Sequence, residues 1–320
     1  MALSVIAQCT KGLIGVSAVL ISGTAILLYI YQTSLIYPAN MPADSRSVVM
    51  TPNEFDMPYQ DITLQSGAYK IKAYLITHPS SQTSRSRPTV IIFHANAGNM
   101  GHRLPLAQVF YKNLNTNVLM VSYRGYGKSE GVPSEAGIRI DARAALKFIQ
   151  QHPLTSSTNV ILYGQSIGGA VCIDLAKDYP DSIHALILEN TFTSIPQLIP
   201  SIIPLLTPFT FLCTEKWNSG ESIKKIGKSV HTLFLSGRQD EIVPVSHMES
   251  LYRKVKEDRD EKLSSICTWK SFPHGTHNDT CISPDYWNSV ADFLNQISQT
   301  NQQKEPLEWS YEEINKHHLM

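Results

Sequence analysis

Short apolar runs alternate with segments of helical length through most of this 320-residue chain, and this alternation constrains the fold more than any other feature. Continuous apolar strands separated by helices are typical of a mostly parallel sheet that is covered on both faces. The apolar runs are Thr89–Phe93, Asn117–Ser122, Asn159–Tyr163, Ala185–Leu188, Thr232–Leu235 and Cys267–Phe272. The helical segments are Pro105–Leu114, Ser134–Gln151, Ser166–Tyr179, Val245–Val255 and Pro284–Ile297. The sequence therefore predicts an α/β fold.

Four regions lie outside this alternation. Two short alternating runs, Asp61–Leu64 and Lys70–Thr77, predict an antiparallel start to the sheet. Repeated prolines among apolar residues at about 192–225 exclude one regular helix and favour a small cap on the domain of residues 59–298. Residues 32–58 are predicted to be a linker, and the polar residues 299–320 a loose tail.

An uncharged apolar run extends from Leu13 to Tyr31, after a short N-terminal segment at 1–12. As a helix that rises about 1.5 Å per residue, this run is roughly 28 Å long, which is enough to cross a bilayer core. Tyr29 and Tyr31 end it, where tyrosine rings favour the membrane interface. A cleaved signal peptide is the alternative, but its apolar region is typically about 7 to 15 residues long. We therefore predict a transmembrane signal anchor at 13–31.

The charges beside the anchor leave its orientation open. Lys11 argues for a cytoplasmic N-terminus against the more distant Arg46, and the domain would then face a lumen. The sequence contains a single glycosylation sequon, Asn278-Asp279-Thr280, so it gives little evidence that the domain faces a lumen where proteins are glycosylated. We predict a single-pass protein of the endoplasmic reticulum or another endomembrane, in contact with membrane lipid through the anchor.

Charge composition argues against nucleic acid as a partner, and residue spacing in the anchor bears on a second copy of the chain. Lys+Arg and Asp+Glu both number 27, so the net charge of 0 gives no reason to expect nucleic-acid binding. A stripe of small residues in the anchor allows a homodimer, although such residues are common in membrane helices. The stripe consists of Gly15, Ala18, Ser22 and Ala25.

Cysteine and glycine patterns predict neither a metal nor a cofactor. The five cysteines are scattered without a CxxC pair, which argues against a zinc module or a disulfide scaffold, and Cys9 is a weak acylation candidate beside the anchor. No HExxH motif occurs. Gly127-Lys128-Ser129 resembles the end of a phosphate loop, but Ser122 stands where that loop requires glycine. The turn Arg124–Gly127 more simply shapes a strand-to-helix crossing near the site.

The strongest chemical signal is Gly164-Gln165-Ser166-Ile167-Gly168, which follows an apolar strand and opens a helix. This GxSxG pattern in that context is typical of a nucleophile elbow, which exposes the serine hydroxyl above the strand ends. Side chains two positions from the serine would collide with neighbouring backbone, so glycine is required there. Ser166 is the candidate nucleophile.

A serine nucleophile needs a base, and the base needs an acid that holds its tautomer. Asp240 follows the strand Thr232–Leu235, and His277 lies in the loop after the last strand, so these two are the candidate acid and base. His274 is the alternative base, but it continues the strand. Glu241 and Glu189 remain fallback acids.

Acyl transfer also requires backbone N–H groups directed at the oxyanion. We expect one from Ile167, the residue after the nucleophile. The second is expected from Asn96, in the loop His94-Ala95-Asn96 that follows the strand Thr89–Phe93. Ala95 is small enough for the chain to turn close to the substrate.

These motifs resemble the α/β-hydrolase superfamily, and more closely the membrane-anchored fungal bud-emergence (Bem-type) family and its animal α/β-hydrolase-domain relatives. The resemblance covers about residues 59–298, agrees with the anchor, and implies Ser166, Asp240 and His277 as nucleophile, acid and base. Two departures are Ala95, where the family usually has glycine, and His274, at a position often acidic in relatives. The motifs that carry it are FHANAGNMGHRLP at 93–105, SYRGYGKSEG at 122–131, GQSIGG at 164–169, LENTFTSI at 188–195, SGRQDEIVP at 236–244 and FPHGTHND at 272–279.

Two functions of different classes fit the sequence. The first is a serine hydrolase of carboxylic esters or thioesters, with acyl groups of lipids or lipidated proteins favoured by the anchor and the apolar cap over small soluble esters or peptides. The second is a membrane-bound scaffold or binding protein on a hydrolase fold, because a fold alone does not fix function. The complete set of candidate residues favours the hydrolase.

Overall fold

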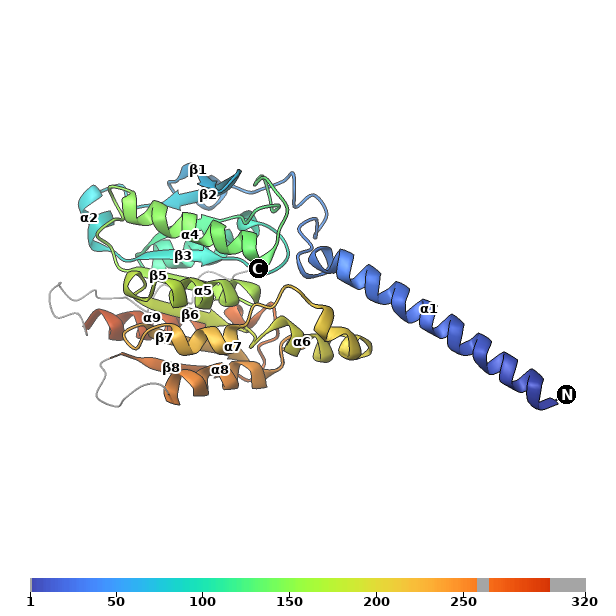
Figure 1. The fold of residues 1–320 in the computed structure, drawn as a ribbon. Helices are drawn as coiled ribbons and strands as arrows, with labels where there is room; N and C mark the ends of the chain where they lie inside the picture. Colours follow the sequence, from blue (N-terminus) through green and yellow to red (C-terminus); the bar gives the residue numbers. More distant parts are fainter. Residues whose placement is uncertain (1, 258–264, 300–320) are drawn as a thin grey trace.

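The computed structural model describes residues 2–257 and 265–299, and in this part of the chain the strands form a single eight-stranded sheet (Figure 1). The strand order is β1-β2-β4-β3-β5-β6-β7-β8. The pairs β1–β2 and β2–β4 are antiparallel, and every later pair is parallel. The predicted α/β fold with an antiparallel start is confirmed.

The strands match the predicted apolar runs to within a few residues. Their bounds are β1 Gln60–Ser66, β2 Tyr69–Ile76, β3 Thr89–Phe93, β4 Asn117–Val121, β5 Val160–Gln165, β6 Ala185–Glu189, β7 His231–Gly237 and β8 Cys267–Phe272. The α-helices are α1 Ala2–Ile36, α2 Ser81–Ser86, α3 Leu104–Gln108, α4 Glu135–Gln151, α5 Ile167–Asp178, α6 Ile195–Ile202, α7 Ser219–Ser222, α8 Val245–Glu257 and α9 Tyr286–Gln299.

Each central strand buries both of its faces. In β3, Ile91 and Phe93 belong to the apolar cluster that contains residues of α4, α5 and α8, whereas Val90 and Ile92 belong to the cluster that contains residues of α3 and α9. Alternate side chains of a strand point to opposite faces, so two apolar clusters form, one on each side of the sheet. This explains why the predicted strands are continuously apolar.

One helical prediction differs from the structure, and the short helix α2 was not predicted. The predicted helix Pro105–Leu114 is short α3 followed by a π-helical turn at Val109–Asn113. The polar stretch Ser80–Arg87 contains α2, which begins where the Ser80 hydroxyl accepts a hydrogen bond from the N–H of Thr83 at 3.4 Å. A side-chain cap of this kind lets a polar segment form a helical turn.

The proline-rich segment folds into a cap beside the sheet. It consists of α6, a 3₁₀ helix at Pro204–Leu212 and the short helix α7. Pro200 and Pro208 lie inside the first two of these elements, so no single long helix forms.

Helix α1 projects away from the domain as a long rod (Figure 1). Residues Gly15–Ile36 are apolar and long enough to cross a membrane. The helix ends at Ile36, beyond Tyr31, where the sequence analysis ends the anchor and begins the linker. Within this last part of the helix, the polar Gln32 bonds to the segment after the 3₁₀ helix of the cap: its Oε1 accepts from the N–H of Thr214 at 2.6 Å.

Candidate active site

Ser166 occupies a sharp turn between β5 and α5. Its backbone has φ 55° and ψ −119°, a conformation that non-glycine residues rarely adopt and that often marks a functional site. The N–H of Ser166 donates to the carbonyl oxygen of Glu189 at 2.9 Å, and the hydroxyl of Thr191 donates to the Ser166 carbonyl at 2.7 Å. These bonds hold the strained residue at the carboxyl end of the sheet.

The glycines two positions from Ser166 leave no room for a side chain. A Cβ on Gly164 would lie 2.2 Å from the carbonyl oxygen of Gly168, and a Cβ on Gly168 would lie 2.0 Å from that of Phe93. The second contact brings the start of α5 against the end of β3. The glycines therefore set the distance between the serine and the loop that follows β3, as the elbow motif requires.

His277 and Asp240 form a buried pair. The imidazole Nδ1 lies 2.9 Å from Asp240 Oδ2 and 3.1 Å from Oδ1, and both side chains are almost completely buried. A carboxylate only accepts hydrogen bonds, so Nδ1 carries the proton and Nε2 is left with a free lone pair. This is the tautomer that a general base needs.

Asp240 is oriented by the turn that contains it. Its Oδ1 accepts hydrogen bonds from the N–H groups of Ile242 at 2.9 Å and Val243 at 2.7 Å. These donors stabilise the ionised carboxylate and fix the direction of its oxygens toward the imidazole.

Side chains from neighbouring strands hold the backbone of the histidine loop. The amide of Gln165, at the end of β5, donates to the His277 carbonyl at 2.8 Å. Asn190, after β6, donates to the carbonyl of Thr276 at 3.1 Å and accepts from the N–H of Gly237 at 2.8 Å. Sequence reasoning missed both residues, although each lies at a strand end beside a candidate residue.

The loop after β3 is held by two tyrosines. Tyr123 donates to the carbonyl of His94 at 2.9 Å, and Tyr126 donates to that of Asn96 at 2.7 Å. Among the hydrogen bonds of the described residues, none involves the backbone N–H of Asn96 or of Ile167. Both N–H groups are therefore available to an oxyanion, and Tyr126 of the Arg124–Gly127 turn contacts the loop that contains Asn96.

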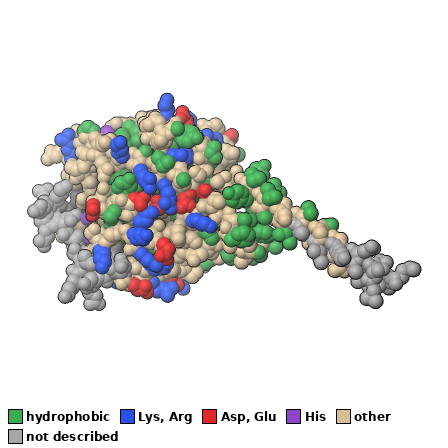
Figure 2. All heavy atoms as spheres, viewed as in Figure 1, with side chains coloured by type: hydrophobic (Ala, Val, Ile, Leu, Met, Phe, Trp, Pro, Cys, Tyr) green, Lys and Arg blue, Asp and Glu red, His purple; other side chains and the backbone are tan. Residues whose placement is uncertain are grey.

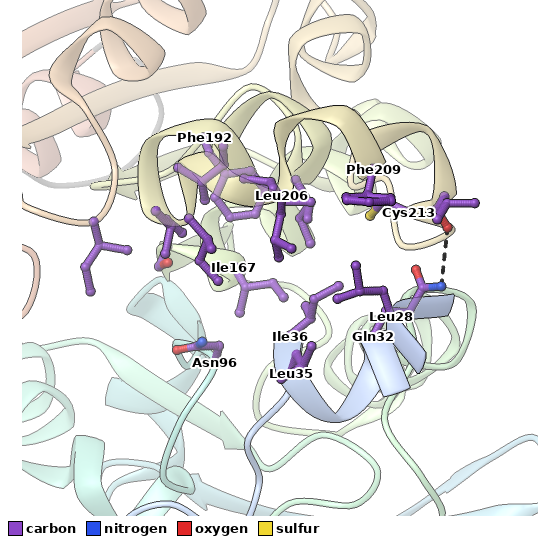
Figure 3. A pocket seen from close by; sticks show the side chains of 18 of the residues that line it. Leu28, Gln32, Leu35, Ile36, Asn96, Ile167, Phe192, Leu206, Phe209 and Cys213 are labelled. Atoms are coloured by element: carbon purple, nitrogen blue, oxygen red, sulfur yellow. Dashed lines mark hydrogen bonds between the residues drawn. The ribbon is translucent and has the colours of Figure 1, made fainter. Parts of the chain in front are cut away.

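One apolar pocket of about 240 Å³ brings the predicted residues together. Ser166, Ile167, Asn96 and His277 all line it, and Asp240 lies behind His277. Its other walls come from the cap and from α1 (Figure 3). Among the hydrogen bonds of the described residues, those of the His277 imidazole go to Asp240 and none joins it to Ser166 Oγ, and the hydrogen bond between nucleophile and base is often long before substrate binds.

The alternative residues lie elsewhere or bond to other groups. His274 is exposed, and its imidazole lies 3.4 Å from the Gln239 amide. The Glu241 side chain accepts only from the backbone N–H of His277, at 3.2 Å. Glu189 is fully buried and accepts from the hydroxyl groups of Tyr163 and Tyr286. Burial raises the pKa of this carboxyl group.

The described residues contain no cluster of three or more His, Cys, Asp or Glu side chains arranged to hold a metal. Four cysteines of this part of the chain, Cys172, Cys213, Cys267 and Cys281, are free thiols. The side chain of Cys9 and the predicted tail lie outside what the structure describes.

Helix α1 contributes to the pocket, which was not predicted from the sequence. Leu28, Gln32, Leu35 and Ile36 line one side of it. Their spacing of three and four residues places them on a single helical face. The polar Gln32 directly after an apolar run is the sequence feature that could have indicated a contact between this helix and the domain.

His94 gives the fold a pH dependence that a variant can isolate. Burial lowers its imidazole pKa from 6.5 to about 3, and its Nδ1 lies 2.7 Å from the Ala95 carbonyl oxygen. The unfolded chain therefore binds one more proton than the folded chain between these pH values, so stability falls as pH falls below 6.5. By pH 5, this group alone costs about 2 kcal/mol.

We expect His94→Asn, which retains a donor for the Ala95 carbonyl, to be less stable at pH 7.5 but to lose less stability on acidification. Urea unfolding of the detergent-solubilised full chain at pH 7.5 and pH 5 measures both effects. If His94→Asn and wild type lost the same free energy of unfolding between pH 7.5 and pH 5, the assignment of this pH dependence to His94 would be contradicted.

Comparison with known proteins places the chain in a family. Residues 84–228 match the family model described as serine aminopeptidase, S33, a range that contains Ser166. Over 272 residues the chain is 49% identical to protein bem46 of Schizosaccharomyces pombe, covering 83% of this chain and 87% of that protein. The chain belongs to the Bem46-type family of α/β-hydrolases.

Two other relatives agree with this family assignment. The uncharacterized membrane protein YNL320W of Saccharomyces cerevisiae is 39% identical, over 83% of this chain and 90% of its own. The α/β-hydrolase domain-containing protein WAV2 of Arabidopsis thaliana is 38% identical, over 88% of this chain and 92% of its own.

Solved structures share the fold at low sequence identity. An esterase of Pyrococcus furiosus superposes with a TM-score of 0.62 at 20% identity, covering 77% of this chain and 94% of that one. An α/β-hydrolase of Vibrio vulnificus gives a TM-score of 0.67 at 19% identity, covering 82% and 92%. Family membership supports hydrolase activity, and these neighbours show that the fold is shared.

Proposed function

We propose that this protein is a membrane-anchored serine hydrolase that cleaves carboxylic ester or thioester bonds of acyl groups. The observation that carries this proposal is the buried Asp240–His277 pair beside a strained Ser166 in one apolar pocket. The Pyrococcus furiosus esterase, which shares the fold, agrees with it.

The reaction uses these residues in two stages. Ser166 Oγ attacks the substrate carbonyl carbon while His277 Nε2 takes the hydroxyl proton, and the N–H groups of Asn96 and Ile167 stabilise the oxyanion. The carbon–oxygen or carbon–sulfur bond then breaks, and His277 gives its proton to the departing alcohol or thiol. Water attacks the acyl carbon of the resulting acyl-enzyme and loses a proton to His277. The bond between that carbon and Ser166 Oγ then breaks, His277 returns the proton to Oγ, and the free acid leaves. Asp240 stabilises the imidazolium throughout.

The membrane part of the proposal is supported by α1. The helix exposes large apolar side chains over the Gly15–Ile36 segment, among them Val19 and Leu20, which water would not solvate favourably. A relative of similar length is named a membrane protein. The full chain is expected to stay in the membrane pellet after alkaline carbonate extraction.

Ser166→Ala tests the proposal. We expect this variant to lose at least about 10³-fold in hydrolysis of p-nitrophenyl esters, because it removes the attacking atom. Ser201→Ala, an exposed position on the cap, is the matched control and retains full activity. Equal activity of Ser166→Ala and wild type would exclude this mechanism.

A further inference from the structure

The membrane helix contributes a wall to the candidate active site. Leu28, Gln32 and Ile36 face Leu206 and Phe209 of the cap across the pocket (Figure 3). Ser166 and His277 line the same pocket. A chain lying in the pocket would therefore pass between α1 and the cap before it reached the serine.

The end of α1 is attached to the domain and is not a free tether. Gln32 joins it to the cap in both directions: its Nε2 donates to the carbonyl of Leu212 at 3.4 Å, and its Oε1 accepts from the Thr214 hydroxyl at 3.0 Å. A polar side chain in an apolar helix is stable when it has such partners.

A second attachment lies one turn further along the chain, at Tyr37. Its buried hydroxyl donates to Glu215 at 2.6 Å and accepts from the indole N–H of Trp217 at 2.8 Å. The Glu215 carboxylate also accepts from the backbone N–H of Glu135 at the start of α4. The position of α1 relative to the sheet is therefore set by buried polar contacts.

The pocket opens on an apolar surface. Leu35 lines the pocket although it is 62% exposed, so the pocket reaches the outside between α1 and the cap. Beside it the cap exposes Leu205 (83%) and Phe211 (75%), together with Ile202 and Ile203. Figure 2 shows apolar side chains gathered where the cap meets α1. This surface is continuous with the segment that can cross a membrane.

We infer that the acyl chain of the substrate enters the site directly from the bilayer, through the opening between α1 and the cap, and that the α1 face is part of the acyl-binding pocket. This inference rests on the proposed function and deepens it. The substrate is a long-chain acyl ester or thioester resident in the membrane. Its carbonyl group reaches Ser166 while its chain lies against Leu28 and Ile36. Among the described residues, no Asp, Glu, Lys or Arg side chain lines the pocket, so an apolar chain there would not meet a charged carboxylate, ammonium or guanidinium group.

A pair of variants at the same depth in the membrane tests the α1 wall. Leu28→Trp fills the pocket, whereas Leu27→Trp places the same ring at a 58% exposed position outside it. In phosphatidylcholine vesicles, we expect Leu28→Trp to reduce kcat/KM for p-nitrophenyl palmitate at least about tenfold. The loss on p-nitrophenyl butyrate should be smaller, so the ratio of palmitate to butyrate activity falls, whereas Leu27→Trp, outside the pocket, should match wild type on both esters.

The two possible failures are distinguishable. If wild type hydrolyses both esters and Leu28→Trp leaves their ratio unchanged, the inference is wrong and the proposed function stands. Hydrolysis rates of palmitoyl glycerol and of an S-palmitoyl peptide on the same vesicles show whether the acyl chain comes from a lipid or from a lipidated protein. Faster hydrolysis of either substrate than of its short-chain analogue supports the inference.

A binding readout tests the inference without catalysis. Full-length Ser166→Ala protein in phosphatidylcholine vesicles is irradiated with a palmitoyl glycerol ester that carries a diazirine in its chain. We expect labelling of Phe192 and Leu198, which are buried in the cap but line the pocket, and loss of that labelling in the Ser166→Ala, Leu28→Trp protein. Labelling confined to outward residues of α1 would overturn the inference.

Discussion

Asp240→Asn is expected to lower kcat about 10³- to 10⁴-fold while the protein remains folded. The amide cannot accept two backbone N–H bonds and also hold His277 Nδ1–H with the strength of a carboxylate. The imidazole then favours the wrong tautomer, and its protonated form loses its counter-charge. Ester hydrolysis by the full chain in detergent, with Tm measured in parallel, checks both expectations.

Two neighbouring acids serve as matched controls for Asp240→Asn. Glu241→Gln retains an oxygen that can accept the N–H of His277, so its kcat should change less than about threefold. Glu189 bonds to tyrosine hydroxyls rather than to the imidazole, so Glu189→Gln should affect stability more than chemistry. A larger loss of kcat in either control than in Asp240→Asn would assign the orienting acid elsewhere.

Gly168→Ala is expected to destabilise the fold by about 3 kcal/mol or more. The added methyl group would lie 2.0 Å from the carbonyl oxygen of Phe93 and 3.0 Å from that of His94. Both neighbours are backbone atoms, so α5 and β3 must separate, and overpacking of this kind is costly. The separation would also displace Ile167 from the loop that contains Asn96.

Urea unfolding of Gly168→Ala and Gly220→Ala checks this expectation. At Gly220 the nearest atom to an added methyl is the end of the flexible Lys254 side chain at 3.2 Å, so that change should cost less than about 1 kcal/mol. Equal stability of the two variants would show that the elbow glycine is not sterically required.

Local patterns in the sequence suffice for the sheet and for the placement of Ser166. Apolar runs such as Thr89–Phe93 are buried on both faces, so their composition alone distinguishes them from half-exposed strands. Asp240 and His277 can be predicted because each follows the carboxyl end of a strand, and the carboxyl ends of the parallel strands β7 and β8 lie at one edge of the sheet.

The remaining features depend on contacts between distant segments. Gln32 lies 182 residues before Thr214, and no local pattern in the sequence predicts that hydrogen bond. Gln165 and Asn190 likewise act on the His277 loop through tertiary contacts. The pocket wall on α1 follows from those contacts and not from hydropathy.

Covalent labelling of the full chain by a fluorophosphonate probe tests the central claim most directly. Mass spectrometry of the digested protein is expected to place one stoichiometric adduct on Ser166, abolished in Ser166→Ala and reduced at least about 10²-fold in rate in His277→Ala. An adduct on another serine, or labelling of Ser166→Ala at the wild-type rate, would contradict the assignment of Ser166 as a nucleophile activated by His277.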